Sequence, residues 1–412
     1  MATYLPTGSQ QKFWGKLEAT DAYNTFVPMV AADALPLMSL EITPSTEFHE
    51  IKERRGSASL SGEVKGKEGG TWSAMAYIKP EGTTITTMPD IGDLLHAAFG
   101  EQNTSGDVSY FLHTSNVEHF APQSLQFVRR AGPYHYESIA GCWVESVEFD
   151  INTEIPTVSF SGGYSSRAYA YGALVNNGSG IVADATTVEL DAGQAEKFAA
   201  GSYIQFNDGG TIKNGGGTAG YEITGVNTTT DVLTISPAIH SVADAPISDD
   251  AVIEGLDLTQ TLTTNDPVSG VGSEFKIGTH GAEVAQGFIS FKVTMATGIK
   301  GLSDEASSAV ATRLILGDRR ITGEFSCYAL SSSTTTLDIM SHIGNGPNGT
   351  PVSLICRAGV VTSQAHCVLN VPAARLDVVP IEVPEAEEAI VTCSFTAQRR
   401  AADGDEFHID FS

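Results

Sequence analysis

The chain has 412 residues, with 23 Lys and Arg against 49 Asp and Glu, which gives a formal net charge of −26. This balance argues against a protein that grips nucleic-acid phosphates or an anionic membrane, because both are bound by clustered basic side chains. Apolar residues make up 41% of the chain, which excludes global disorder, and the length predicts two to four domains. Residues 1–15 lack the pattern of a secretory signal, and no apolar run is long enough for a membrane helix, so we expect no membrane association.

Alternation of apolar and polar residues predicts β-strands over much of the chain. In residues 142–151 the apolar face holds Trp143 and Phe149, with Glu145 as an exception, and residues 391–397 alternate in the same way. The polar positions of these two segments are Ser146, Glu148, Asp150, Thr392, Ser394 and Thr396. Further strands are expected in residues 288–294, 321–329 and 354–357.

Helical patterns are scarce. Residues 89–100 (PDIGDLLHAAFG) have apolar residues at helical spacing, with Asp90 as the expected N-cap and Gly100 as the expected end. A second short helix is expected at residues 334–343, before the glycine-rich breaker at 344–349.

The middle of the chain differs in composition. Residues 168–275 hold fourteen acids and two basic side chains, Lys197 and Lys213, a net charge of −12. Glycine- and asparagine-rich turns separate short strand patterns, which predicts a small all-β module with residues 265–272 as its exit linker. We therefore predict three parts: a first domain with an N-terminal arm at 1–167, this module at 168–272, and a second domain at 273–412.

The two flanking parts repeat one order of elements: strand, helix, a strand ending in Arg-Ala-Gly, a long strand and a terminal strand ending in Arg. The first set is residues 56–64, 89–100, 125–132, 141–151 and 157–167. The second set is residues 319–329, 334–343, 352–359, 366–379 and 390–400. This order favours a duplicated β domain. Because an uncovered sheet edge recruits a partner, and a head-to-tail contact that closes makes a ring, three such chains could form a ring of pseudo-sixfold symmetry.

No catalytic or metal-binding signature is present in the sequence. The cysteines (Cys142, Cys327, Cys356, Cys367 and Cys393) have no CxxC spacing, so we expect small buried apolar residues rather than disulfides or ligands. The ten histidines form no ligand pattern, and the acidic end at 403–410 lacks the order of a calcium loop. We expect no enzyme activity and no cofactor.

Paired arginines concentrate the scarce positive charge at strand ends, either for ion pairs with a neighbouring subunit or for ordinary ion pairs within the chain. Phe13 and Trp14, in the N-terminal arm, could anchor on a neighbouring chain or pack on their own domain. The resulting candidates for subunit contacts are Phe13, Trp14, Arg129, Arg130, Arg319, Arg320, Arg399 and Arg400; Arg54 and Arg55 form a further pair.

The order of these segments resembles the tail tube proteins of long-tailed bacteriophages. The likeness rests on the helix at 89–100, the GCWVESVEF strand from Gly141, the closing TVSFSG strand from Thr157, and the GDRRITGEF stretch at 317–325. It covers residues 35–167 and 288–400 and suggests the type with two tube domains. The module at 168–275 is not part of the common tube fold.

The resemblance implies two tandem β-sandwich domains, each with a short helix, whose inner sheets join between subunits around a lumen. It implies stacked rings, each a trimer of two-domain chains, that conduct genomic DNA and hold the tape measure protein. It also implies tail terminator and tail tip proteins as partners, and a virion tail assembled in the bacterial cytoplasm. Hairpin arms between rings would contain Glu47, Phe48, Ile51, Arg54, Arg55, Lys300, Leu302, Asp304 and Glu305.

Glu148, Asp150, Thr392, Ser394 and Thr396 are candidates for the lumen face, where acidic and neutral side chains would keep DNA from adhering. The alternative is a modular phage or surface adhesin that binds a receptor through the middle module. A β-rich hydrolase is a weaker alternative, because no catalytic site assembles from the sequence.

Overall fold

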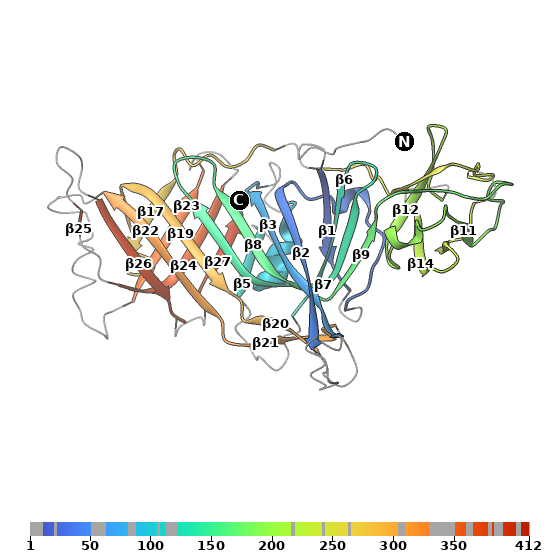
Figure 1. Ribbon diagram of the computed structural model, residues 1–412. Coiled ribbons are helices and arrows are strands. Elements are labelled where there is room, and N and C mark those ends of the chain that lie inside the picture. The colour runs from blue at the N-terminus through green and yellow to red at the C-terminus, as the bar shows by residue number, and fades with distance from the viewer. Residues whose placement is uncertain are drawn as a thin grey trace.

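The computed structural model describes most of the chain. The described residues are 11–19, 23–50, 63–80, 88–104, 108–112, 122–215, 219–240, 244–262, 265–303, 310–328, 351–359, 366–377, 381–382, 390–400 and 405–411. The prediction of a mainly β chain is confirmed, since the described residues form large antiparallel sheets and a single α-helix. Figure 1 shows the second half of the chain, the first half and the middle module in a row.

One sheet passes through both halves of the chain. Its antiparallel ladders follow the order β2–β3–β8–β7–β19–β22–β26, and β24 and β25 pair with the far side of β26. We call it the inner sheet. Its strands are β2 (Leu37–Glu50), β3 (Glu63–Tyr77), β8 (Thr157–Tyr164), β7 (Tyr136–Ile151), β19 (Phe288–Ala296), β22 (Arg320–Tyr328), β26 (Ile390–Ala397), β24 (Cys367–Leu376) and β25 (Ile381–Glu382).

Each half also has an outer sheet, which begins in the first part of β7 or β24. In the first half the order is β1–β6–β7–β9, and in the second half it is β18–β17–β23–β24–β27, continued by β5 and β4 of the first half. The added strands are β1 (Gln11–Leu17), β6 (Leu125–Ala131), β9 (Ser166–Ala170), β17 (Glu274–Gly278), β18 (Val284–Gln286), β23 (Val352–Ala358), β27 (His408–Phe411), β4 (Gly100–Asn103) and β5 (Val108–Leu112).

Strand β7 passes from the outer to the inner sheet at a kink. Gly141 has φ +62°, a left-handed conformation that glycine adopts without steric cost, and its N–H donates to the carboxylate of Glu18 at 2.7 Å. A bulge follows between Val144 and Ser146, which shifts the side-chain alternation by one residue. The assignment of Trp143 to the buried face is therefore wrong: Val144 is buried, whereas Trp143 is half-buried and Glu145 is exposed.

Helix α1 (Gly92–Phe99) is where the sequence predicts it. Its C-cap Gly100 is left-handed at φ 92°, as expected, but Ile91 occupies the N-cap without a side-chain hydrogen bond, so the expectation for Asp90 is wrong. Leu94, Leu95 and Phe99 are buried in a core that passes through both halves. The expected helix at 334–343 lies outside the described residues.

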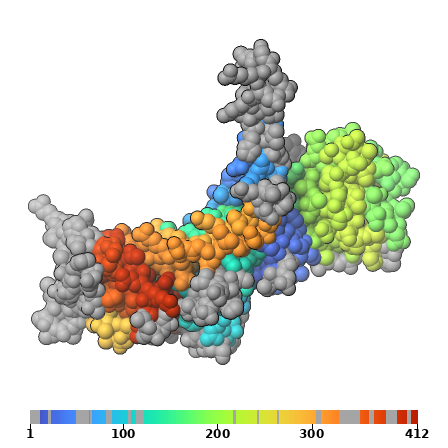
Figure 2. Space-filling model, turned by 90° about the horizontal axis from the view of Figure 1, so that it is seen from below, coloured from blue at the N-terminus to red at the C-terminus, as the bar shows by residue number. Residues whose placement is uncertain are grey.

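The middle module has its own sheet, ordered β10–β16–β12–β14–β15–β11 with β13 paired to β12, and its own hydrophobic core. In Figure 2 it forms a separate green lobe beside the first half. The elements are β10 (Ala173–Leu174), β11 (Thr187–Glu189), the 3-10 turn η4 (Ala195–Lys197), β12 (Tyr203–Asp208), β13 (Thr211–Lys213), β14 (Tyr221–Asn227), β15 (Val232–Ser236) and β16 (Val252–Gly255).

The module contacts the first half through its core and through the segment that follows it in the chain. Trp14, Val128 and Tyr136 of the first half belong to the module's core. The expected exit linker packs on the first half: Val268 is buried in the main core and its N–H donates to the carbonyl of Ile78 at 2.9 Å. The domain limits at 167 and 272 remain predictions, although β9 continues to Ala170.

Candidate functional site: one face and two edges of the inner sheet

The candidate lumen residues lie together on one face of the inner sheet. Glu148 of β7 is opposite Thr294 of β19, Thr294 is opposite Thr322 of β22, and Thr322 is opposite Thr396 of β26. In the neighbouring row, the register runs from Asp150 through Lys292 and Glu324 to Ser394. The apolar side chains between these positions, such as Phe149 and Phe395, are buried in the main core. The polar face is thus continuous across the two halves.

The polar face is rich in hydroxyl and carboxyl groups. Lys292 pairs with Glu148 at 2.8 Å, and Thr294 donates to the same carboxylate at 3.2 Å. The hydrogen bond with Glu148 raises the pKa of Lys292, which stays charged at neutral pH. Both partners are more than a third exposed, so the pair contributes little to stability.

Shallow depressions follow this face. One, of about 350 Å³, is lined by Glu41, Ser73, Glu148 and Ser159 among others. Within the described ranges, no group of three or more His, Cys, Asp and Glu side chains is placed to hold a metal ion. The face offers carboxylates and hydroxyls, such as those of Glu148 and Thr294.

The two predicted arms lie side by side. Glu47 and Phe48 are exposed near the end of β2, and Lys300 and Leu302 are exposed on β20 (Ile299–Leu302), which pairs with β21 (Arg313–Leu316). Figure 1 shows both hairpins at the same side of the molecule. The other arm candidates, Ile51, Arg54, Arg55, Asp304 and Glu305, lie outside the described residues.

A groove of about 360 Å³ separates the bases of the two arms, between Glu47 and Lys67 on one side and Ser303 and Ala311 on the other. Trp143 lines it and packs against two glycines. A Cβ atom on Gly163 would lie 2.1 Å from the indole, and one on Gly301 would lie 2.6 Å from it. The indole therefore fixes the β20–β21 arm against the first half.

Three of the paired arginines, Arg129, Arg130 and Arg319, make ion pairs within the chain. Arg129 pairs with Glu137, and Arg130 binds the carbonyl of Gly255 at 3.2 Å and the carboxylate of Asp257 at 2.9 Å, which joins the first half to the module. Arg319 pairs with Glu406 at 3.2 Å. Arg320 and Arg399 are exposed, and the backbone N–H of Arg400 donates to the carbonyl of Asp405.

Phe13 and Trp14 occupy opposite faces of β1. Phe13 is 5% exposed in the main core, and Trp14 is 1% exposed in the core of the module. Both side chains are therefore held by their own chain, which is the second of the two alternatives left by the sequence. The interpretation of these residues as anchors on a neighbouring chain is corrected accordingly.

All five cysteines are buried and free, as predicted. Burial raises the pKa of Cys327 to about 12 and that of Cys393 to about 11, so neither thiol is a reactive nucleophile at neutral pH. The described part of the acidic C-terminal segment ends in strand β27, and His408 at the start of this strand contacts Asp405 and Asp410.

Two groups of residues were missed by the sequence reasoning. Glu41, Lys292 and Glu324 complete the polar face, and the alternation around Lys292 and Glu324 could have identified them. The second group surrounds Glu137 on β7. Arg129 on the preceding strand β6 is 8 residues from Glu137, but Arg167 on β9 is 30 residues away, so the pairing of β7 with β9 completes the group.

Comparisons with known proteins give little further information. No protein-family model matches the chain, and no curated protein matches it either. A solved structure described as a type six secretion system protein aligns at 8% identity and a TM-score of 0.21, over 40% of this chain and 85% of that one. A TM-score of this size does not establish a shared fold, so the likeness carries no conclusion about this protein. Among the described residues, no helix has the length and apolarity needed to cross a membrane.

Proposed function

We propose that this protein is a structural subunit of a phage-type tail tube, without enzymatic activity, that assembles head to tail into rings and stacked rings. Its rings enclose a lumen through which genomic DNA passes. The observation that carries the proposal is the ladder between β7 and β19, because it joins two similar halves into one sheet in a way that a further copy can repeat.

The two halves repeat each other down to their irregularities. In the first half the β2–β3 ladder is offset between Leu37 and Ser39, and in the second half the β19–β22 ladder is offset between Phe288 and Ser290. The β6–β7 ladder is irregular between Leu125 and Phe127, and the β23–β24 ladder is irregular between Val352 and Leu354. In both ladders an advance of two residues on the first strand corresponds to three residues on its partner. Matching bulge positions within one chain support a duplicated unit rather than two unrelated sandwiches.

The duplication defines how a second copy would be added. Within the chain, Lys292 of β19 is opposite Asp150 of β7, and Val293 is opposite Phe149. Among the described strands, β2 pairs only with β3, and β25 lies at the opposite end of the sheet beside β26. The matching bulges align Glu41 of β2 with Lys292 of β19, and Glu382 of β25 with Asp150 of β7. If two copies meet with the same register as β7 and β19, Glu41 of one chain lies opposite Glu382 of the next. The same contact repeated around an axis closes a ring.

The polar face fits the wall of a DNA conduit. The described residues of this face carry hydroxyl and carboxylate groups and no cluster of Lys and Arg. DNA that passes the face would therefore release few of its counterions and would not be retained. The exposed arms, with Glu47 and Lys300, would contact the next ring. Other proposed partners are the tape measure protein within the lumen and the terminator and tip proteins at the tube ends, and the proposed location is the virion tail.

Cysteine cross-linking tests this register. We expect the double variant Glu41→Cys/Glu382→Cys to form disulfides between chains upon oxidation, because opposite residues on neighbouring strands have Cβ atoms about 4.5–5.5 Å apart. Non-reducing electrophoresis would show a ladder that ends at the number of chains in a ring. Electron microscopy of the same sample would show rings or tubes.

Glu41→Cys/Ile381→Cys is the matched control, because a shift of one residue moves the second thiol to the opposite face. Wild-type protein that remains monomeric over a wide concentration range contradicts the proposed function. Rings of the double variant that form without a disulfide between the two introduced thiols contradict the register.

A further inference from the structure

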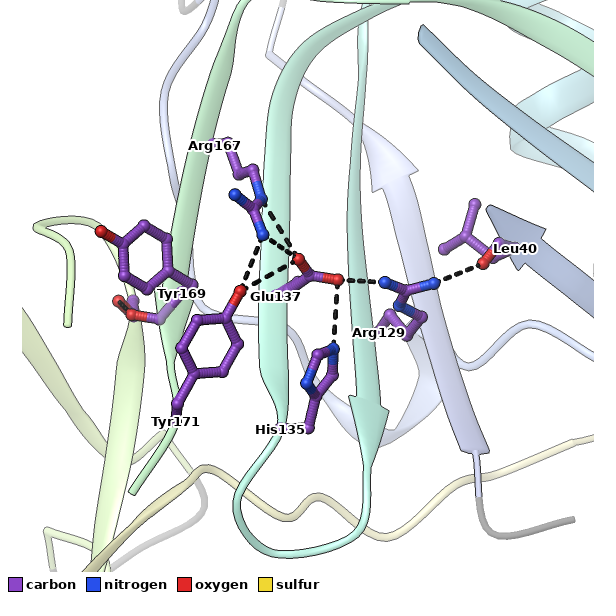
Figure 3. Close-up of polar contacts among 8 residues, drawn as sticks. Leu40, Arg129, His135, Glu137, Arg167, Tyr169 and Tyr171 are labelled. Carbon is purple, nitrogen blue, oxygen red and sulfur yellow. Dashed lines mark hydrogen bonds and ion pairs between the residues drawn. The ribbon is translucent and has the colours of Figure 1, made fainter. Parts of the chain in front are cut away.

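The first half carries a compact polar cluster on its outer sheet (Figure 3). Glu137 is 4% exposed and is paired with Arg129 of β6 and Arg167 of β9. His135 lies 3.3 Å from one of its oxygens, and the hydroxyl of Tyr171 donates to the other at 3.2 Å. Burial alone would raise the pKa of Glu137, but hydrogen bonds from His135 and Arg167 and the charge of Arg129 outweigh it and hold that pKa well below its usual range.

The cluster lies beside the open edge of the inner sheet. Arg129 donates from its second nitrogen to the carbonyl of Leu40 on β2, at 3.0 Å. Leu40 neighbours Glu41 on the strand whose outer edge would receive the next copy. The charged groups thus reach strand β2, and Figure 3 shows the hydrogen bond from Arg129 to Leu40.

The equivalent positions of the second half are apolar. Counted from the matching irregularities in the β6–β7 and β23–β24 ladders, Glu137 corresponds to Leu369. Glu137 is opposite Arg129 and Tyr169, and Leu369 is opposite Cys356 and Ile409. By the same alignment, Arg167 corresponds to Phe407 and Tyr171 corresponds to Phe411. The apolar counterparts, all at most 3% exposed, are Cys356, Leu369, Phe407, Ile409 and Phe411.

Those apolar residues are covered by the first half of the same chain. The ring of Phe407 lies 5.5 Å from Phe99 of α1 and 6.0 Å from Phe149 of β7, and Phe411 lies 6.0 Å from Tyr110 of β5. The second half is therefore attached to the first half through this face of its outer sheet. In a head-to-tail ring, the same face of the first half meets the second half of a neighbouring copy.

We propose, building on the function proposed above, that the surface formed by Arg129, His135, Glu137, Arg167, Tyr169 and Tyr171 is the docking face for the second half of another copy of this chain. We call it the Glu137 face. The difference between the two faces follows from how each junction forms. The junction within the chain is formed during folding and is never solvated, whereas the junction between chains is exposed to water before assembly and cannot be an open apolar patch.

The composition of the Glu137 face suits a contact that forms after folding. Tyr169 and Tyr171 stack with ring centres 5.0 Å apart, and the guanidinium of Arg167 lies 5.3 Å from the centre of the Tyr169 ring. Tyrosine and arginine are among the residue types that carry most of the binding energy in protein interfaces. Since Glu137 already has its partners, docking leaves no buried carboxylate unpaired.

Reversing one charge tests the proposal. We expect Arg167→Glu to lower the fraction of chains in rings at least tenfold at a concentration where the wild type assembles, while the circular dichroism spectrum stays unchanged. Lys276→Glu is the control: Lys276 is also a strand residue paired with a glutamate, Glu274, at 3.1 Å, and its side chain is 33% exposed against 26% for Arg167. It lies on the other face of its outer sheet, opposite Ile355. We expect it to assemble normally.

A second measurement needs no substitution. Modification of histidines with diethyl pyrocarbonate, located by mass spectrometry, compares His135 with the exposed His240 of the module in unassembled and assembled wild-type protein. We expect assembly to protect His135 at least fivefold and to leave His240 reactive. A wild type that never forms rings refutes the proposed function and this docking face with it. Rings in which His135 stays as reactive as in the monomer, or which Arg167→Glu forms as well as the wild type, overturn the docking face alone.

Discussion

The two halves of the chain share one hydrophobic core, whereas the middle module has its own. The main core extends from Phe13 in β1 to Phe411 in β27, although these strands are almost the whole chain apart in sequence. The module's core runs from Ala170 to Leu258 and includes a few side chains of the first half, such as Trp14 and Tyr136. We therefore expect the two halves to unfold as one unit and the module to unfold as a second.

The strongest test of this comparison is Phe407→Ala. Phe407 is fully buried between Phe99 and Phe149, so we expect a loss of about 3–5 kcal/mol in the free energy of unfolding. Because the core is shared, hydrogen exchange followed by mass spectrometry would show lower protection in both halves, with the module unaffected. Loss of protection in the second half alone would contradict a shared core.

A substitution of similar size in the module gives the converse result. Phe206 is fully buried, with its ring 5.5 Å from that of Tyr221, and Phe206→Ala would cost about 3–5 kcal/mol within the module. We expect the loss of exchange protection to be confined to residues 173–258, and rings still to form. Deletion of the module is a poorer test, because it would expose Trp14 and Tyr136.

A smaller effect is expected at the Glu137 face. Glu137→Gln leaves Arg129 and Arg167 without their carboxylate, at a cost of about 3 kcal/mol, the lower end for a buried pair because the arginines are half-buried. The folded-state pKa of Glu137 lies below its ordinary value of 4.5, so its stabilising contribution is present above that pH and is lost as the pH falls through the lowered pKa.

Denaturant unfolding of the wild type and Glu137→Gln at pH 7 and at successively lower pH measures this dependence. The difference between the two proteins should shrink as the solution becomes more acidic. A difference that stays constant would mean that Glu137 acts through packing and not through its charge.

The smallest effect is expected on the polar face. Lys292→Ala removes the pair with Glu148, and since both side chains are well exposed the loss would be below about 1 kcal/mol. Thermal unfolding would show a nearly unchanged midpoint. A loss as large as that of Glu137→Gln would indicate that this face is buried within an assembly.

The sequence identified features that depend on local periodicity. The strand at 142–151, the helix ending at Gly100, the buried cysteines and the polar positions around Glu148 on β7 and Ser394 on β26 all follow from alternation or helical spacing. It failed at Trp143, because a bulge changes the alternation and depends on how β8 pairs with β7. It left Phe13 and Trp14 between two alternatives, because their place in a strand is set by pairing with β6.

What the sequence determined by itself is therefore the β-rich class and the acidic composition, because each is a property of neighbouring residues or of counts. The repeated order of elements stays a prediction, since its second helix lies outside the described residues. Only the tertiary structure decided that β7 pairs with β19, that the halves share one core, and that Glu137 gathers Arg129 and Arg167. Apart from the pair of Arg129 and Glu137, which are 8 residues apart, these contacts join residues distant in sequence. Their register depends on where the bulges fall and which apolar surfaces meet.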